Sequence, residues 1–354
     1  MSNAGTTALL GLLKIGLPIL QAPMAGVSSP AMAAEVSNAG GLGAIGVGAA
    51  GVEGARQMIR EVRARSSGPL NVNVFAHRPA LADAEREAAW IERLRARFAE
   101  LGGSPPRQLN EIYTSFAADD AMLAMLLEER PAVVSLHFGL ADPARLRALR
   151  EAGTVLLATA TSLAEARRAV EAGVHAIVAQ GYEAGGHRGV FDPYGPDDEL
   201  GTIALTRLLA VNLDVPIIAA GGIMDGRGIT AALGLGAAAG QLGTAYVPTD
   251  ESLADEGYRA ALFSEAAQHT IMTRAISGRP ARSLANRFTA LAAGIHEADI
   301  PAYPIAYDLA KALHALARKA GEFGYGAQWA GQGAPLARRM SAGLLTRALA
   351  SEMR

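Results

Sequence analysis

The sequence lacks cysteine altogether: none occurs among its 354 residues. Disulfides, thiolate nucleophiles and cysteine-ligated metals are therefore excluded. An excess of charge of one sign is also lacking, because 32 Lys and Arg residues stand against 34 Asp and Glu residues, a formal net charge of −2 at pH 7. A chain so close to neutrality gives no reason to expect nucleic acid or an anionic membrane as a partner.

Long apolar runs are absent as well. Gly, Arg and Glu interrupt every apolar stretch before it reaches the roughly 20 residues of a membrane span. Residues 1–16 lack the cationic start and the long apolar stretch of a signal peptide. We therefore expect a soluble, cytoplasmic protein. Half of the residues are hydrophobic, enough for one large domain or two ordinary ones.

What the sequence does have is a repeating unit of a short apolar run, a loop and an Ala-rich amphipathic segment. Continuous apolar runs are typical of strands buried on both faces of a parallel sheet. Eight such runs alternating with helices favour a (β/α)8 TIM barrel, with an open doubly wound sheet as the alternative, because sequence does not show closure. The predicted strands are 18–21, 42–47, 70–74, 132–136, 155–158, 176–179, 216–219 and 237–242, and the predicted helices are 30–38, 54–65, 119–129, 143–151, 163–171, 203–211 and 226–233.

Two segments do not fit the repeat. Residues 78–110 contain a charged helical stretch and form a predicted insertion after the third strand, either a lid over the pocket or a packing element. We assign residues 1–250 to the barrel and residues 251–354 to a helical extension that packs on it and contributes to the substrate pocket. Whether this extension is a separate small domain or a cover is not decided by the pattern, and its Ala- and Arg-rich helices leave the oligomeric state open.

The stretch 180–189, Gln-Gly-Tyr-Glu-Ala-Gly-Gly-His-Arg-Gly, follows the sixth predicted strand. Its glycines allow a ligand to approach the backbone, and His187 can exchange a proton near neutral pH. A flexible backbone with one titrating base at a strand exit is what a cofactor-dependent active site needs. The alternative is a Gly-rich surface turn with an incidental histidine.

Glycine turns also follow the seventh and eighth predicted strands, where barrels of this kind commonly bind phosphate through backbone N–H groups. Gly222 lies in the first turn, and Gly243 and Thr244 lie in the second. The two matched turns favour a phosphate over ligand-free βα turns. Asp225 is placed to cap the helix that follows the first of them.

Side-chain amides occur at the exits of three predicted strands, at Asn73, Gln180 and Gln241. Three amides at one face of the barrel favour recognition of the edge of a heterocycle. Asn71 shares the side-chain direction of Asn73 but lies deeper in its strand, and we expect it to be structural. The non-helical segment around Met24, at the exit of the first strand, could lie against a flat ring.

His137 follows the fourth predicted strand and so repeats the placing of His187, whereas the other histidines are predicted to be structural or at the surface. Tyr303, Tyr307 and Lys311 are spaced four residues apart and would line one face of a helix. The alternative for these three residues is an amphipathic packing stripe.

Segments 22–27, 181–189, 219–223, 241–246 and 277–282 together resemble the nitronate monooxygenase family, formerly called 2-nitropropane dioxygenases, over residues 17–311. The resemblance implies a TIM barrel that binds FMN non-covalently, without metal or nicotinamide cofactor. It also implies oxidation of alkyl nitronates, including propionate 3-nitronate, by O2 to a carbonyl compound and nitrite, through one-electron transfer to the flavin. Family members differ in whether they accept neutral nitroalkanes.

The same resemblance implies roles for individual residues. His187 would be the catalytic base. The implied FMN contacts are Met24, Asn73, Gln180, Gly185, Gly222, Gln241, Gly243 and Thr244. The residues that resemble the substrate pocket of the bacterial class I enzymes are Tyr113, His137, Tyr303, Tyr307 and Lys311.

Three other functions remain open at this point. An FMN-dependent enoyl-ACP reductase would share the barrel and the Gly-Gly-His loop but would need NAD(P)H. A non-catalytic flavin carrier would bind FMN without releasing nitrite. A phosphate-binding isomerase or lyase barrel would contain no flavin.

Overall fold

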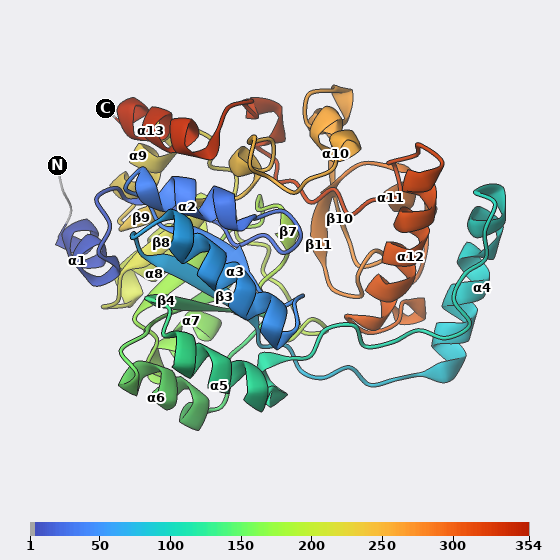
Figure 1. Ribbon diagram of the computed structural model, residues 1–354, viewed down its shortest axis with the longest axis horizontal. Helices are drawn as coiled ribbons and strands as arrows, with labels where there is room; N and C mark the ends of the chain where they lie inside the picture. Colours follow the sequence, from blue (N-terminus) through green and yellow to red (C-terminus); the bar gives the residue numbers. More distant parts are fainter. Residues whose placement is uncertain (1–3, 354) are drawn as a thin grey trace.

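The protein, described here as a computed structural model, is built on a closed barrel of eight parallel strands (Figure 1). The structure describes residues 4–353. Met1–Asn3 and Arg354 lie outside this range, and the first three belong to the segment compared above with a signal peptide. The strand order is β1-β9-β8-β6-β5-β4-β3-β2, and a parallel bridge between Leu20 and Leu42 joins its two ends. The barrel prediction is therefore confirmed over the open sheet. The strands are β1 (Ile19–Gln21), β2 (Gly43–Gly46), β3 (Leu70–Phe75), β4 (Val133–His137), β5 (Val155–Ala160), β6 (Ala176–Gln180), β8 (Ile217–Ala220) and β9 (Ala239–Leu242).

The predicted helices between the strands are all present. Asp225 caps its helix as expected, because its side chain accepts a hydrogen bond from the backbone N–H of Gly228. Ser162 caps α7 in the same way, by accepting from the backbone N–H of Glu165. Each cap satisfies a backbone donor that the first turn of a helix leaves free. The helices are α2 (Pro30–Asn38), α3 (Val52–Arg65), α5 (Asp120–Glu129), α6 (Pro143–Glu151), α7 (Leu163–Glu171), α8 (Thr202–Asn212) and α9 (Gly226–Gly234).

One helix, α1 (Ala4–Leu13), was not predicted. Its residues Leu9 and Leu13 are fully buried in one cluster with Leu20, Val133 and Ala238 from the barrel strands. In Figure 1, α1 lies at the end of the barrel opposite to α12. It therefore covers the N-terminal ends of the strands and leaves the other end for a site.

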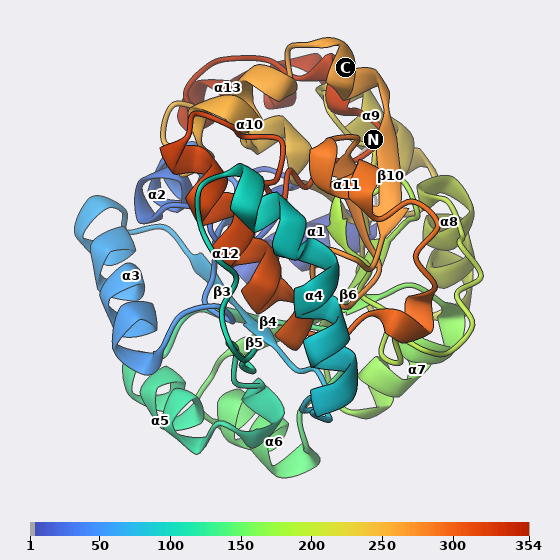
Figure 2. The ribbon, with the colours of Figure 1, turned by 90° about the vertical axis from the view of Figure 1, so that its right-hand side faces the viewer.

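The insertion after β3 forms α4 (Ala84–Glu100), which begins at the cap Asp83. The apolar face of α4 packs against α12 (Ile305–Lys319), where Trp90 and Phe98 share a cluster with Leu309 (Figure 2). No residue of α4 lines the large cavity described below. The insertion is therefore a packing element for α12 and not a wall of the pocket.

The extension is mostly helical, but it also contains two short strands that were not predicted. Strands β10 (Thr270–Thr273) and β11 (Ala281–Leu284) form an antiparallel sheet with β7 (Gly186–His187). Sequence periodicity cannot reveal a two-residue strand such as β7, because pairing with β11 alone defines it. The further elements are α10 (Glu256–Ala261), α11 (Arg287–Leu291), α13 (Ala342–Glu352) and the 3-10 turns η1 (Phe116–Ala118), η2 (Thr244–Tyr246), η3 (Glu265–Gln268), η4 (Glu297–Asp299) and η5 (Ala334–Leu336).

The last helix, α13, packs between α2 and α9 and contacts both. It shares a buried cluster with them through Leu345, Val36 and Ile229. The segment predicted as an extension thus also supplies the eighth helix of the ring around the barrel. Within residues 4–353, no helix is both long and apolar enough to cross a membrane.

Candidate active site

A cavity of about 600 Å³ opens at the C-terminal ends of the barrel strands. Its volume is typical of a site for a cofactor or a small ligand. Strand ends and the loops that follow them form one side of the cavity, and α12 with residues 325–333 forms the other. The structure brings all of the predicted site residues to this cavity: Met24, Asn73, Tyr113, His137, Gln180, Gly185, His187, Gly222, Gln241, Gly243, Thr244, Tyr303, Tyr307 and Lys311.

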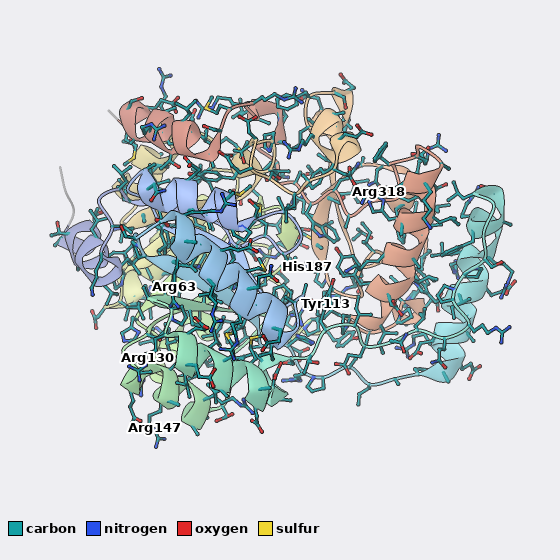
Figure 3. The ribbon with its side chains drawn as sticks, in the orientation of Figure 1. Arg63, Tyr113, Arg130, Arg147, His187 and Arg318 are labelled. Carbon is teal, nitrogen blue, oxygen red and sulfur yellow. The ribbon has the colours of Figure 1, made fainter. Side chains whose placement is uncertain are left out.

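His187 lies between the barrel and the extension (Figure 3). Its backbone pairs with Ala281 of β11. The amide of Gln180 holds the same loop at two points: its Nε2 donates to the carbonyl oxygen of His187 at 2.9 Å, and its Oε1 accepts from the N–H of Gly189 at 2.7 Å. Gln180 therefore fixes the position of His187 as well as lining the cavity.

The imidazole of His187 is surrounded by aromatic rings and one hydroxyl. Its Nε2 lies 2.8 Å from Oγ of Ser277, and its ring centroid lies 4.9 Å from that of Trp329 and 5.5 Å from that of Tyr303. Burial, and next the neighbouring His137, lower the pKa of His187 well below its ordinary value. The imidazole is therefore neutral at pH 7 and can accept a proton.

His137 lies beside the same loop, with its Nε2 3.3 Å from the carbonyl oxygen of His187. Burial, and next the charge of Arg279, lower the pKa of His137 to about 4. The cavity thus contains two neutral imidazoles rather than a cation and a base. The positive charge beside these two imidazoles must therefore come from another side chain, and Lys311 lines the same cavity.

Lys311 projects from α12 toward Tyr113, and its Nζ donates a hydrogen bond to the hydroxyl of Tyr113 at 2.9 Å. The Nζ atom also lies 5.2 Å from the ring centroid of Tyr113 and 5.7 Å from that of Tyr307, within the range of cation–π contacts. Burial raises the pKa of Tyr113 to about 12, so its hydroxyl stays protonated. This arrangement holds the side-chain nitrogen of Lys311 at the cavity wall, and no carboxylate among the described residues is bonded to it.

The prediction that three residues share a helical face holds only for Tyr307 and Lys311. Tyr303 lies before α12, because Pro304 is the N-cap of that helix and disfavours helical backbone in the residue preceding it. Its ring nevertheless faces the cavity and lies 6.3 Å from that of Tyr113. Tyr303 and Tyr307 therefore both pack against their apolar neighbours and line the cavity.

The glycine turns form the opposite side of the cavity. Gly221 and Gly222 have φ values of +121° and +70°, which favour glycine. A Cβ on Gly185 would lie 2.4 Å from the backbone nitrogen of Gly331, and Gly331 itself donates to Oγ1 of Thr244 at 3.0 Å. The glycine-rich stretch of the extension therefore crosses directly over the predicted phosphate turns.

The polar side chains at the other strand exits are also ordered. Asn73 donates through Nδ2 to both the carbonyl oxygen and the hydroxyl of Ser135, each at 3.0 Å. Gln241 and Met24 line the cavity, whereas Asn71 is buried outside its lining. Among the described residues, no group of three or more His, Asp or Glu side chains is arranged to hold a metal ion.

Several residues at or beside the cavity were not predicted. Trp329 lines the cavity from a glycine-rich stretch of the extension, residues 321–334. Ser277 does not line the cavity but contacts His187, and it lies in a segment recognised only for its family likeness. His314, which was expected to be structural or at the surface, lines the cavity, and its Nε2 lies 3.2 Å from Oδ2 of Asp255. Their part in the site depends on how the extension folds back, which no local pattern encodes.

A family model described as nitronate monooxygenase matches residues 6–352 of the chain. The chain is 59% identical to a nitronate monooxygenase of Paraburkholderia phytofirmans, over 99% of this chain and 96% of that protein. It is 52% identical to a nitronate monooxygenase of Pseudomonas aeruginosa, over 97% of this chain and 98% of that protein.

Two solved structures are similar to the whole chain. A nitroalkane oxidase from Streptomyces ansochromogenes superposes with a TM-score of 0.89 at 41% identity, covering 98% of each chain. FabK from Thermotoga maritima superposes with a TM-score of 0.75 at 29% identity, covering 98% of this chain and 95% of that one. The nitroalkane-oxidising structure is the more similar of the two in both fold and sequence.

Proposed function

Because this chain belongs to the nitronate monooxygenase family, we propose that it oxidises alkyl nitronates, propionate 3-nitronate among them, with O2 to a carbonyl compound and nitrite. It is an oxidoreductase by family membership. The observation that carries the proposal is the convergence of His187, Lys311 and the glycine turns on one cavity. A proton acceptor, a cation and bare backbone are what the proposed substrate and cofactor require.

FMN is the cofactor we assign to the barrel end of the cavity. The residues fit it: the turn at Gly222 has a φ of +70°, and a Cβ at Gly243 would meet only Ala22 and Met24 within 4 Å, so both backbones are open to a phosphate. Amides of Asn73 and Gln241 could bond the polar edge of the ring system. When bound, the flavin accepts an electron from the substrate and lets O2 complete the oxidation.

His187 supplies the base for a neutral nitroalkane substrate. The α-proton of such a compound is acidic because the resulting charge spreads onto the nitro oxygens. The lowered pKa keeps His187 unprotonated at neutral pH, and its Nε2 is engaged by Ser277, so Nδ1 is the atom we assign to proton abstraction. A nitronate that is already ionised needs no such step.

Lys311 binds the anionic nitronate through a charge-assisted hydrogen bond. Its Nζ is held by the hydroxyl of Tyr113 and is free of any carboxylate bond among the described residues. The rings of Tyr303, Tyr307 and Trp329 pack around His187 and make this part of the cavity wall apolar. Anion and base are thereby placed in a site of low polarity, where their interactions are strengthened.

The test begins with an absorbance spectrum of the purified protein, followed by addition of propionate 3-nitronate in air and an assay of nitrite. Flavin bands with nitrite release and no requirement for NADH are the expected result. Flavin bands without nitrite, accompanied by oxidation of NAD(P)H, would replace the proposal by a reductase. Flavin without either activity would indicate a carrier, and a colourless protein that cannot be loaded with FMN would refute the cofactor assignment.

A further inference from the structure

Three arginine side chains of the site region are almost fully buried, and they differ in how their charge is compensated. Arg188 forms two contacts of 2.8 Å with the carboxylate of Asp197. Arg282 donates to the carbonyl oxygen of Tyr182 and to Oγ1 of Thr270. Neither guanidinium is left without strong acceptors.

Arg279 is different. Only 2% of it is exposed, its Nη2 donates to the carbonyl oxygen of Val190, and its Nε has no hydrogen-bond partner. Among the described residues, no carboxylate lies within ion-pair distance of it. Burial lowers the pKa of Arg279 to about 10, which still leaves the group charged at neutral pH. A buried charge without a counter-ion is costly, so its retention calls for an explanation.

The position of this charge links it to the active site. The guanidinium carbon of Arg279 lies 4.3 Å from the ring centroid of Phe138. The ring of Phe138 also contacts both histidines: its centroid lies 4.4 Å from the ring centroid of His137 and 5.5 Å from that of His187. The cation therefore lies behind a single aromatic ring that contacts both imidazoles of the cavity.

We propose that Arg279 is a positioning residue of the reaction, whose uncompensated charge keeps His187 and His137 unprotonated and favours an anion in the cavity. A nearby cation disfavours a second positive charge on an imidazole and attracts negative charge through a medium of low polarity. The inference rests on the proposed function only in taking His187 as the base, and its test needs no turnover.

Among the described residues, no carboxylate lies against the ring of His187 or His137. Burial, then Arg279, and more weakly Arg188 lower the pKa of His137, whereas its contact with the carbonyl oxygen of His187 raises that pKa. Burial, His137 and Arg279, in that order, lower the pKa of His187. The hydroxyls that face the site are protonated, because burial raises the pKa of the tyrosines. The titratable and charged groups that face the two imidazoles or Arg279 are His77, Tyr113, His137, Glu165, Arg188, His187, Tyr194, Arg274, Arg279, Tyr303, Tyr307 and Lys311. Glu165 favours the charge of Arg279, but the two form no ion pair among the described residues.

The experiment is an NMR titration of ring-labelled histidines in the flavin-loaded full-length protein, with His187→Asn and His137→Asn variants used for assignment. Arg279→Met removes the charge at similar size, and Arg279→Lys retains it. Arg282→Met removes another buried cation from the same hairpin and serves as the matched control.

We expect Arg279→Met to shift the titration midpoint of His137 upward from about 4 toward 6.5, and that of His187 upward as well. Arg279→Lys should retain the low midpoints, and Arg282→Met should leave them unchanged. Unchanged midpoints in a folded Arg279→Met protein, or equal upward shifts in the Lys variant, would overturn the inference. If Arg279→Met does not fold, Arg279→Gln, which keeps a donor for Val190, takes its place.

The titration of the wild-type protein can by itself overturn the inference. Midpoints near the ordinary histidine value of about 6.5 would overturn the inference without any variant. If the midpoints shift as expected but no nitrite is released from any nitronate, the proposed function fails while the electrostatic role of Arg279 stands.

Discussion

Nε2 of His187 and Oγ of Ser277 lie 2.8 Å apart, a contact that spans 90 residues of sequence. The Ser277 hydroxyl donates to the carbonyl oxygen of Arg279 at 3.3 Å, and its oxygen can then accept a hydrogen bond from Nε2–H of His187. We assign the Nε2–H tautomer of His187 from this pattern, which leaves the lone pair of Nδ1 for the substrate. Ser277 therefore orients the proposed base in the way that a third group orients a base in a catalytic triad.

Replacing Ser277 by alanine should lower kcat for neutral nitroalkanes about tenfold, because an unoriented imidazole loses part of the contribution of general base catalysis. Turnover of pre-formed nitronates should change little. Steady-state kinetics on both substrates check this, with Ser277→Thr as the control that retains the hydroxyl. An equal loss on both substrates would assign Ser277 to packing alone.

Replacing His187 by asparagine removes the proton acceptor while keeping a polar side chain of similar size. Turnover of neutral nitroalkanes should fall by roughly 10²–10⁴-fold, the usual contribution of a general base. Oxidation of the pre-formed nitronate should be reduced far less. The measurement is nitrite release from matched nitroalkane and nitronate, and a common factor for the two would contradict the base role.

Replacing Lys311 by methionine should lower kcat/KM for nitronates by roughly 10- to 100-fold, because a hydrogen bond to a charged group contributes about 1.5–3 kcal/mol. The dependence of kcat/KM on ionic strength should weaken at the same time, since a cation at the site attracts the anionic substrate. Lys311→Arg, which retains the charge, is the control. A salt dependence that survives the methionine substitution would place the attraction elsewhere.

Acid should destabilise the protein through its buried histidines. Burial lowers the pKa of His77 to about 4, whereas in the unfolded chain it is close to 6.5, so the unfolded state binds more protons in between. The stability contributed by neutral His77 is complete above pH 6.5 and is lost as the pH falls toward 4, about 3 kcal/mol in total.

Comparison with His77→Phe tests this effect, because phenylalanine can keep the edge contact with Tyr303 but cannot bind a proton. Free energies of unfolding by urea should fall less steeply between pH 6.5 and 4 in the variant than in the wild type. If the free energy of unfolding falls equally steeply in the two proteins, another group must cause the loss of stability at acid pH.

Replacing Gly331 by alanine should weaken FMN binding, because the new Cβ would lie 2.6 Å from the carbonyl oxygen of Glu183 and 2.9 Å from the backbone nitrogen of Gly185. One of the two crossing segments must move, and the turns assigned to the phosphate move with it. Fluorescence titration of the apoprotein with FMN measures the change. Gly11→Ala, at a helical position with no atom within 4 Å of the new Cβ, is the matched control.

The sequence by itself determined the alternation of strands and helices, whereas the structure decided that the sheet closes into a barrel. Most strands are apolar runs buried on both faces, and most of the helices between them begin at a capping side chain, so both kinds of element are encoded within a few residues. The positions of His187, which we propose as the base, of the amides and of the glycine turns were predictable for a related reason. In a barrel of parallel strands, residues that follow the strands are brought to one face, whatever their distance in sequence.

The tertiary structure alone decided how the extension completes the site. The strand β7 exists only because β11 pairs with it. Ser277 and Trp329 contact His187, and Arg279 contacts the ring of Phe138, only because the extension folds back over the barrel. These contacts join residues far apart in the chain, and no local propensity or periodicity specifies such pairs. The charge environment of His187 followed from the same packing, since burial and next the neighbouring His137 lower its pKa.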